Sequence, residues 1–254
     1  MTTSLYVLTG ASRGMGLAIA TRLLSRDHTL LCISRQTSAA LAEQARQKGA
    51  ALIQWQQDLA EGTKASLRLA EWLQAQPAGV FTEASLINNA GAIPRISALG
   101  DMPSDSLDGL AQALRVGLEA PLQLTAAFLS ATRNWSAKRK ILNVSSGLGR
   151  RAMAAQAAYC AAKAGMDHFT RCLALEEALK PDGAKVCSLA PGVIDTDMQH
   201  QLRSADAASF PDKGNFVKLK SAGSLATADD AAAHVLAFLA SPDFGDQPVA
   251  DVRG

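Results

Sequence analysis

The sequence has no long apolar run and no block of like charge. No stretch reaches the roughly 20 apolar residues of a membrane-spanning helix, and the first residues show neither the basic region nor the apolar core of a secretory signal. The 25 basic and 23 acidic residues are spread along the chain, which disfavours binding to nucleic acid or to an anionic membrane. The short basic cluster at 138–140 is expected to be a solvated loop. These absences predict a cytoplasmic protein.

Cysteine and histidine are scarce, with four of each in 254 residues. They are Cys32, Cys160, Cys172, Cys187, His28, His168, His200 and His234. The cysteines form no CxxC pair and no zinc spacing, which predicts buried, reduced thiols, and the histidines form no metal set. Asp195 and Asp197 have the spacing of a possible metal pair, but capping of a helix is the favoured interpretation. No metal site is predicted.

Strand-like and helix-like segments alternate along the chain. Short β-branched or leucine-rich runs predict strands at 5–9, 29–34, 51–56, 84–88, 141–145, 185–189 and 247–252. Amphipathic stretches predict helices at 16–25, 38–48, 63–76, 104–133 (interrupted by Gly117 and Pro121), 156–179 and 227–239 (capped by Thr227). The polar segment 195–224 is expected to be irregular and to act as a substrate loop. The pattern predicts an α/β fold, a single Rossmann-like domain over 1–254 with a doubly wound parallel sheet and helices on both faces.

A glycine-rich turn follows the first predicted strand. Gly10, Gly14 and Gly16 stand directly before or at the start of the first predicted helix. Glycines let the backbone turn tightly and approach a diphosphate, whose charge is favoured at a helix N-terminus. The spacing GxxxGxG differs from the commonest dinucleotide fingerprint, G-x-G-x-x-G. Its position after the first strand nevertheless predicts a dinucleotide site.

The end of the second strand decides between the two nicotinamide dinucleotides. An acidic residue there would bind the ribose 2′-hydroxyl of NAD and repel the 2′-phosphate of NADP. This chain has Ser34 and Arg35 instead, with Arg13 inside the glycine turn. Two guanidinium groups and a hydroxyl can hold a phosphate dianion, so we expect NADP(H); two solvated arginines are the alternative. Asp58, after the third strand, either takes the adenine amino group or forms a turn.

Ser146, Tyr159 and Lys163 form the candidate catalytic set. Tyr159 and Lys163 are four residues apart in a predicted helix, so their side chains share one face. A free phenol has a pKa of about 10, and a cation at about 4 Å with an effective dielectric of about 20 contributes about 4 kcal/mol. Burial opposes the cation, so we expect a smaller net lowering of the pKa of Tyr159. The Ser146 hydroxyl, thirteen positions before Tyr159, would hold a carbonyl oxygen beside the phenol, with Ser145 as the alternative serine.

These motifs resemble, in the same order, those of the short-chain dehydrogenase/reductase family. The matching residues are Thr9–Gly16, Asn88–Gly91, Ser146, Tyr159 with Lys163, and Pro191–Thr196, and the resemblance covers essentially the whole chain. It implies hydride exchange between a nicotinamide cofactor and a carbonyl or alcohol, with Lys163 binding the nicotinamide ribose, and a homodimer or homotetramer. The cofactor contacts expected from the motifs and the resemblance together are Gly10, Ser12, Arg13, Gly14, Met15, Gly16, Ser34, Arg35, Asp58, Leu59, Asn89, Ala90, Gly91, Tyr159, Lys163, Pro191, Gly192, Ile194 and Thr196.

The C-terminal third, from Phe210 on, more loosely resembles the sepiapterin reductase and benzil reductase branch of the family. This implies an NADPH-dependent reductase of ketones or diketones, with Asp251 as either a substrate anchor or a structural residue. An alcohol dehydrogenase working toward oxidation and a non-catalytic NADP(H)-sensing regulator are the alternatives. Gly117 departs from the family pattern, which commonly has an asparagine that helps to hold a water on a proton path to the lysine.

Overall fold

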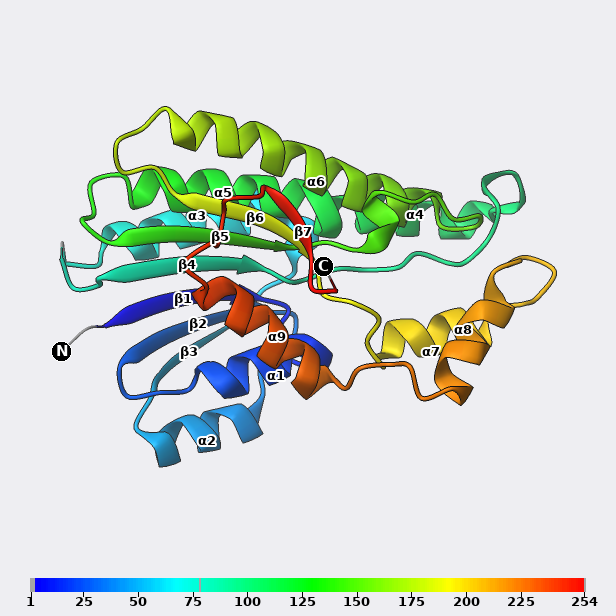
Figure 1. Ribbon diagram of the computed structural model, residues 1–254, viewed down its shortest axis with the longest axis horizontal. Helices are drawn as coiled ribbons and strands as arrows, with labels where there is room; N and C mark the ends of the chain where they lie inside the picture. Colours follow the sequence, from blue (N-terminus) through cyan, green and yellow to red (C-terminus); the bar gives the residue numbers. More distant parts are fainter. Residues whose placement is uncertain (1–2, 78, 254) are drawn as a thin grey trace.

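The computed structural model describes residues 3–77 and 79–253, which form a parallel sheet between two layers of helices (Figure 1). Within these residues the sheet has seven strands in the order β3-β2-β1-β4-β5-β6-β7, and every neighbouring pair is parallel. The strands are β1 (Ser4–Thr9), β2 (His28–Ser34), β3 (Ala51–Gln56), β4 (Glu83–Asn88), β5 (Lys138–Val144), β6 (Lys185–Ala190) and β7 (Val249–Asp251). Each predicted strand is confirmed, with small differences at the ends.

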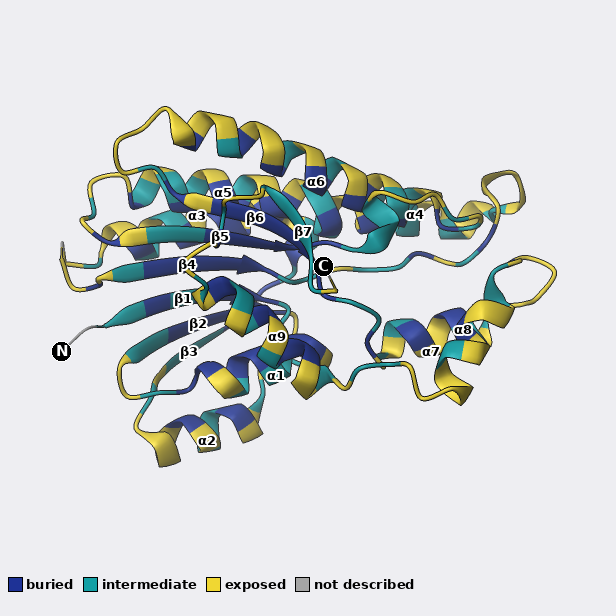
Figure 2. Ribbon diagram, viewed as in Figure 1, coloured by how far each residue is buried: buried dark blue, intermediate teal, exposed yellow. Residues whose placement is uncertain are grey.

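Helices cover both faces of the sheet, which confirms the doubly wound α/β prediction. One face carries α1 (Gly14–Leu23), α2 (Ala39–Lys48) and α9 (Ala228–Ala240); the other carries α3 (Gly62–Gln74), α5 (Ala120–Ala131) and α6 (Ala157–Ala178), with α4 (Leu107–Leu114) against α6. The strands and the inner sides of the helices form two buried apolar clusters, one on each face. Figure 2 shows the same division, with exposed residues on the outer turns of the helices.

The chain changes direction across the sheet after β3. β1 pairs with β2 on one side and with β4 on the other, so the connections that follow β1 and β4 leave toward opposite faces. In doubly wound sheets this divergence opens a crevice at the carboxyl ends of the strands. Because β1 ends at Thr9 and β4 at Asn88, the glycine turn and the segment 89–91 both begin at this edge.

A π-helical segment, η4 (Arg115–Glu119), divides the predicted helix at 104–133 into α4 and α5. The predicted interruption at Gly117 is confirmed, and packing explains the glycine, because an added Cβ would lie 3.1 Å from the Cβ of Ala162 in α6. Segments of this kind occur frequently at functional sites. Pro121 does not interrupt a helix; it lies in the first turn of α5, where the missing N–H costs no hydrogen bond.

The prediction of an irregular segment at 195–224 is wrong. This segment contains two helices, α7 (Asp197–Ser204) and α8 (Lys213–Ser221). Three of its residues form a third buried cluster, and they are Leu202, Phe210 and Phe216. The packing of these few apolar side chains stabilises the two helices, which is why their polar sequence does not show a clear apolar period.

Three smaller predictions have mixed outcomes. The basic residues at 138–140 are not a loop, because they form the first part of β5. Thr227 does cap α9, and its Oγ1 accepts from the N–H of Asp230 at 3.0 Å. Cys172 is exposed and Cys160 partly so, against the expectation of buried thiols. None of the helices in the described parts of the chain has both the length and the apolar content needed to cross a membrane.

Candidate active site

A cavity of about 1190 Å³ opens at the carboxyl ends of the strands. It brings together the glycine turn after β1, the ends of β2, β3 and β5, the turn after β4, the start of α6 and the segment after β6. Every residue predicted for catalysis or cofactor binding, from Gly10 to Thr196, lines this one cavity. The fold therefore places side by side the motifs that the sequence separates by up to 186 residues (196 − 10).

The glycine turn directs a helix N-terminus at the cavity. Gly10 and Gly14 have φ angles of +72° and +54°, in the left-handed region that favours glycine. Gly16 is required by close approach, since an added Cβ would lie 2.1 Å from the carbonyl oxygen of Gly10. Among the described residues no side chain caps α1, whereas the Ser38 hydroxyl caps α2. The free N–H groups of α1 fit the diphosphate of a dinucleotide.

Two predicted cofactor residues hold the turn in this shape. The side-chain amide of Asn89 donates to the carbonyl oxygens of Thr9 and Gly10, at 2.9 and 3.3 Å. The hydroxyl oxygen of Ser34 accepts from the N–H of Ala11 at 2.8 Å. Ser34 therefore has its hydroxyl hydrogen left for a phosphate, and Asn89 acts on the cofactor site through the backbone that it positions.

The two arginines predicted to hold a 2′-phosphate differ in their surroundings. Arg35 is exposed at the end of β2 and lines the cavity. Arg13 extends from the glycine turn to α7, where its Nη1 lies 2.9 Å from Oδ2 of Asp197. A phosphate at this point would compete with Asp197 for Arg13. The expectation that Asp195 or Asp197 caps a helix is wrong, because the N-cap of α7 is Thr196.

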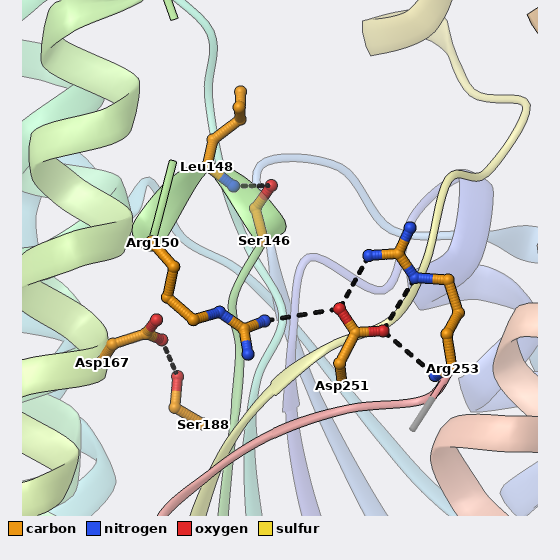
Figure 3. Close-up of polar contacts among 7 residues, drawn as sticks. All are labelled: Ser146, Leu148, Arg150, Asp167, Ser188, Asp251 and Arg253. Carbon is orange, nitrogen blue, oxygen red and sulfur yellow. Dashed lines mark hydrogen bonds and ion pairs between the residues drawn. The ribbon is translucent and has the colours of Figure 1, made fainter. Parts of the chain in front are cut away.

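Asp58 and Asp251, whose roles were left open, both make local contacts. The Oδ1 of Asp58 accepts from the N–H of Ala60 at 2.9 Å, so the turn interpretation is confirmed, although Asp58 also lines the cavity. Asp251 accepts two hydrogen bonds from the guanidinium of Arg253, at 2.7 and 2.8 Å, and lies 3.5 Å from that of Arg150 (Figure 3). Arg253 lines the cavity and Asp251 holds it there, which fits the structural alternative for Asp251.

The sheet and one long helix position the predicted catalytic set. Ser146 follows β5, while Tyr159 and Lys163 lie one turn apart in α6. The Oγ of Ser146 accepts from the N–H of Leu148 at 3.2 Å (Figure 3), which leaves its own hydrogen free to donate. Ser145 also lines the cavity, but Ser146 is the serine that lowers the pKa of the Tyr159 phenol. This favours Ser146 as the serine of the set.

Burial dominates the electrostatics of Tyr159. The residue is 8% exposed, and burial raises the pKa of its phenol to about 12, while the hydrogen bond with Ser146 lowers that pKa by less. The expected net lowering is therefore wrong for this structure. Burial outweighs the cation, because Lys163 Nζ lies 5.8 Å from the ring centroid and donates to the carbonyl oxygen of Val144 at 2.7 Å. A phenol in this setting stays protonated, and so remains a proton donor, throughout the neutral range.

Lys163 is a buried ammonium group with a carboxylate one helical turn further along α6. Burial lowers the pKa of Lys163 to about 8, and the charge of Asp167 raises it by less. Asp167 is 1% exposed, and its Oδ1 accepts from the hydroxyl of Ser188 at 2.6 Å (Figure 3). The positive charge of Lys163 is thus present at neutral pH and is lost as the pH rises through about 8.

The cavity also contains polar residues that the sequence did not single out. Gln156, Gln199 and Arg203 line it, and each has a buried side-chain atom with no hydrogen-bond partner in residues 3–77 and 79–253. They lie before α6 and in α7, outside every motif. Spacing carries no signal for them, because tertiary packing alone brings these side chains to the cavity, through α7 for Gln199 and Arg203.

Comparison with known proteins agrees with this geometry. The family model for short chain dehydrogenases matches residues 5–207. Benzil reductase ((S)-benzoin forming) of Bacillus cereus is 32% identical over 238 residues, which cover 94% of each chain. Sepiapterin reductase of Xenopus laevis is 34% identical over 236 residues, 85% of this chain and 86% of that protein. A solved structure from Agrobacterium tumefaciens with bound NADP has a TM-score of 0.78 at 25% identity and covers 99% and 95% of the two chains.

The relatives include a benzil reductase and a sepiapterin reductase, the two enzymes of the branch that the C-terminal third resembles. The predicted resemblance to this branch is therefore confirmed. The uncapped N-terminus of α1 and the candidate catalytic set share one cavity, which is the arrangement that a nicotinamide cofactor and a small-molecule substrate need. The chain is therefore an oxidoreductase of the short-chain dehydrogenase/reductase family, whose members bind a nicotinamide cofactor.

Proposed function

We propose that this protein is an NADPH-dependent reductase of ketones or diketones. The observation that carries the proposal is the meeting of Ser146, Tyr159 and Lys163 with the glycine turn in one cavity. NADPH supplies the hydride when it is bound. The relatives named for the reduction of benzil and sepiapterin support a substrate with more than one oxygen function.

Tyr159 is the general acid in this proposal. Its phenol donates a proton to the carbonyl oxygen, and the Ser146 hydroxyl, whose oxygen already accepts from Leu148, donates a hydrogen bond to the same oxygen. Proton donation leaves a phenolate, which the nearby charge of Lys163 favours. Burial of Tyr159 and Lys163, 8% and 4% exposed, keeps bulk water from competing for the proton.

We propose Arg35 as the main contact that selects NADPH over NADH, since Arg13 is already paired with Asp197. Arg35→Asp removes a charge-assisted contact with the 2′-phosphate and adds a repulsive carboxylate. We expect the affinity for NADPH to fall by about tenfold to hundredfold and that for NADH to stay constant or rise. Fluorescence titration with each cofactor measures both values. Arg133→Asp, at an exposed site outside the cavity, is the charge-matched control. If the ratio of the affinities for NADPH and NADH did not change in Arg35→Asp, Arg35 would not select the cofactor.

The absorbance of reduced nicotinamide tests the activity itself. We expect the wild-type protein to consume NADPH in the presence of benzil and related diketones, and to do so faster than it oxidises the corresponding alcohols with NADP⁺. Faster oxidation would favour the alcohol dehydrogenase alternative. Binding of NADPH without its consumption, across a broad panel of ketones, diketones, quinones and pterins, would favour the NADP(H)-sensing regulator and end the proposal.

We also propose one cytoplasmic domain that assembles into a homodimer or homotetramer through α4, α5 and α6. Large apolar side chains stand exposed on all three helices, with Leu114 at 38%, Leu122 at 42% and Leu175 at 73%. Burial of such a surface against a second copy would remove it from water. Sedimentation velocity checks the assembly, and a monomer at assay concentration would overturn it.

A further inference from the structure

Leu202 and Phe216 line one side of the cavity and form a buried apolar cluster with Phe210. Leu202, Phe210 and Phe216, from α7, α8 and the loop between them, are 4%, 0% and 7% exposed. The rings of Phe210 and Phe216 are stacked with their centroids 5.6 Å apart. Ile93 and Met153 pack against this cluster and line the same cavity as Tyr159. A polar atom buried on this side of the cavity must be satisfied by the protein or by a bound molecule.

Two polar side chains of α7 each have a buried atom without a hydrogen-bond partner among the described residues. Gln199 and Arg203 are one turn apart in α7, so they share a face, and both line the cavity. Gln199 is 8% exposed, and its Oε1 has no hydrogen-bond partner within residues 3–77 and 79–253. The same holds for Nη1 of Arg203, which is fully enclosed. A buried donor on a charged group is among the costliest groups to leave unpaired.

The charges around Arg203 leave a positive excess. Its Nη2 lies 3.4 Å from Oδ1 of Asp195, and Oδ2 of the same carboxylate lies 2.6 Å from Nζ of Lys220. Two cations thus share one carboxylate, so the guanidinium of Arg203 is only partly neutralised. A partly neutralised guanidinium with a free N–H favours an oxygen acceptor.

We propose that Arg203 is a specificity residue, whose Nη1–H donates to a second oxygen of the carbonyl substrate. The inference rests on the proposed reductase function and adds the substrate feature that the cavity recognises. A second ketone oxygen and a carboxylate oxygen share this acceptor chemistry. A monoketone of the same shape leaves Arg203 unpaired and is therefore disfavoured.

Benzil and deoxybenzoin form a matched pair of probes, because deoxybenzoin has a methylene group in place of the second carbonyl. We expect the wild-type protein to have a lower KM for benzil than for deoxybenzoin. Arg203→Met should raise the KM for benzil by about tenfold to hundredfold and leave that for deoxybenzoin unchanged, with NADPH affinity and melting temperature retained. Phenylglyoxylate is the anionic probe. If Arg203→Lys partly restores the KM for phenylglyoxylate but not the KM for benzil, a carboxylate is the preferred second group.

Lys218→Met is the control variant, because it removes an exposed cation of α8 outside the cavity lining and leaves both ion pairs of Asp195 in place. It should preserve the ratio of the two KM values. An equal rise for benzil and deoxybenzoin in Arg203→Met would show that Arg203 only supports α7, and would overturn the proposal. Calorimetric titration with phenylglyoxylate separates the failure of the specificity site from the failure of the reductase function. If the wild type binds phenylglyoxylate without reducing it and Arg203→Met does not bind it, the specificity site stands and the reductase function fails. If the wild type and Arg203→Met bind it equally, the specificity site fails.

Discussion

In Tyr159→Phe, kcat for any accepted ketone is expected to fall by about 10²- to 10⁴-fold, the range that loss of a general acid produces. NADPH affinity should stay close to that of the wild type, because the substitution removes one oxygen and keeps the ring. Lys163 should also stay in place, since its Nζ is held by the carbonyl oxygen of Val144 at 2.7 Å rather than by the phenol. The variant therefore isolates the proton that Tyr159 is proposed to donate.

The chain offers a matched control for this experiment. Its other tyrosine, Tyr6, lies in β1 outside the cavity lining, with its ring 5.0 Å from that of His28. Tyr6→Phe makes the same chemical change without access to the substrate, so kcat should not change. Stopped-flow measurement of hydride transfer, together with a fluorescence titration of NADPH, separates chemistry from binding in both variants.

Two results would contradict the role of Tyr159. Full activity in a stable Tyr159→Phe would show that another group donates the proton, and Ser146, which lines the same cavity, would be the first candidate. Loss of NADPH affinity in proportion to activity would instead make the hydroxyl a binding group. Both outcomes are distinguishable from unfolding by the melting temperature.

Local motifs explain why most of the fold and site could be predicted. The strands are nearly continuous apolar runs because both faces of the sheet are covered, and such runs are visible in sequence. Gly10 and Gly16 mark a turn that only glycine can make. Tyr159 and Lys163 need only one turn of helix to share a face, so their spacing was sufficient to place them in one site.

The main failures concern properties that depend on tertiary packing. The helices of the segment 195–224 rely on Phe210 and Phe216 meeting each other, which no local period records. The pKa of Tyr159 rises because the folded chain encloses the ring, and the benefit of the cation depends on a distance that helix geometry alone does not fix. Arg203 faces the cavity only because α7 exists and packs there. The sequence therefore located the candidate catalytic set better than the other side chains that line the cavity.

Gly16→Ala is expected to lower stability and cofactor affinity together. An added Cβ would lie 2.1 Å from the carbonyl oxygen of Gly10 and 2.5 Å from Nδ2 of Asn89. A backbone oxygen cannot turn aside as a flexible side chain can, so the glycine turn itself must move. Forcing a methyl group into such a site costs about 1–3 kcal/mol, and the better helix propensity of alanine offsets about 1 kcal/mol of that at most.

The shift would reach the cofactor through Asn89. Its amide donates to the carbonyl oxygens of Thr9 and Gly10 and so fixes the turn that presents the N–H groups of α1. Because a misplacement of about 1 Å can cost about 10²-fold in function, we expect NADPH to bind at least about tenfold more weakly. The melting temperature should fall by about 2–4 °C for each kcal/mol lost. Calorimetric unfolding and an NADPH titration measure the two effects.

Gly214→Ala makes the same change where space is available. Gly214 lies in the first turn of α8, and an added Cβ there meets no heavy atom within 4 Å among the described residues. Its melting temperature should stay constant or rise slightly, because alanine loses less entropy than glycine when a helix forms, and its NADPH affinity should not change. The two variants share their chemistry and differ in the room around the new methyl group. If Gly16→Ala also kept both its stability and its NADPH affinity, the glycine turn would have to accommodate a methyl group despite the 2.1 Å approach. The proposal that close approach requires glycine at position 16 of the cofactor site would then be wrong.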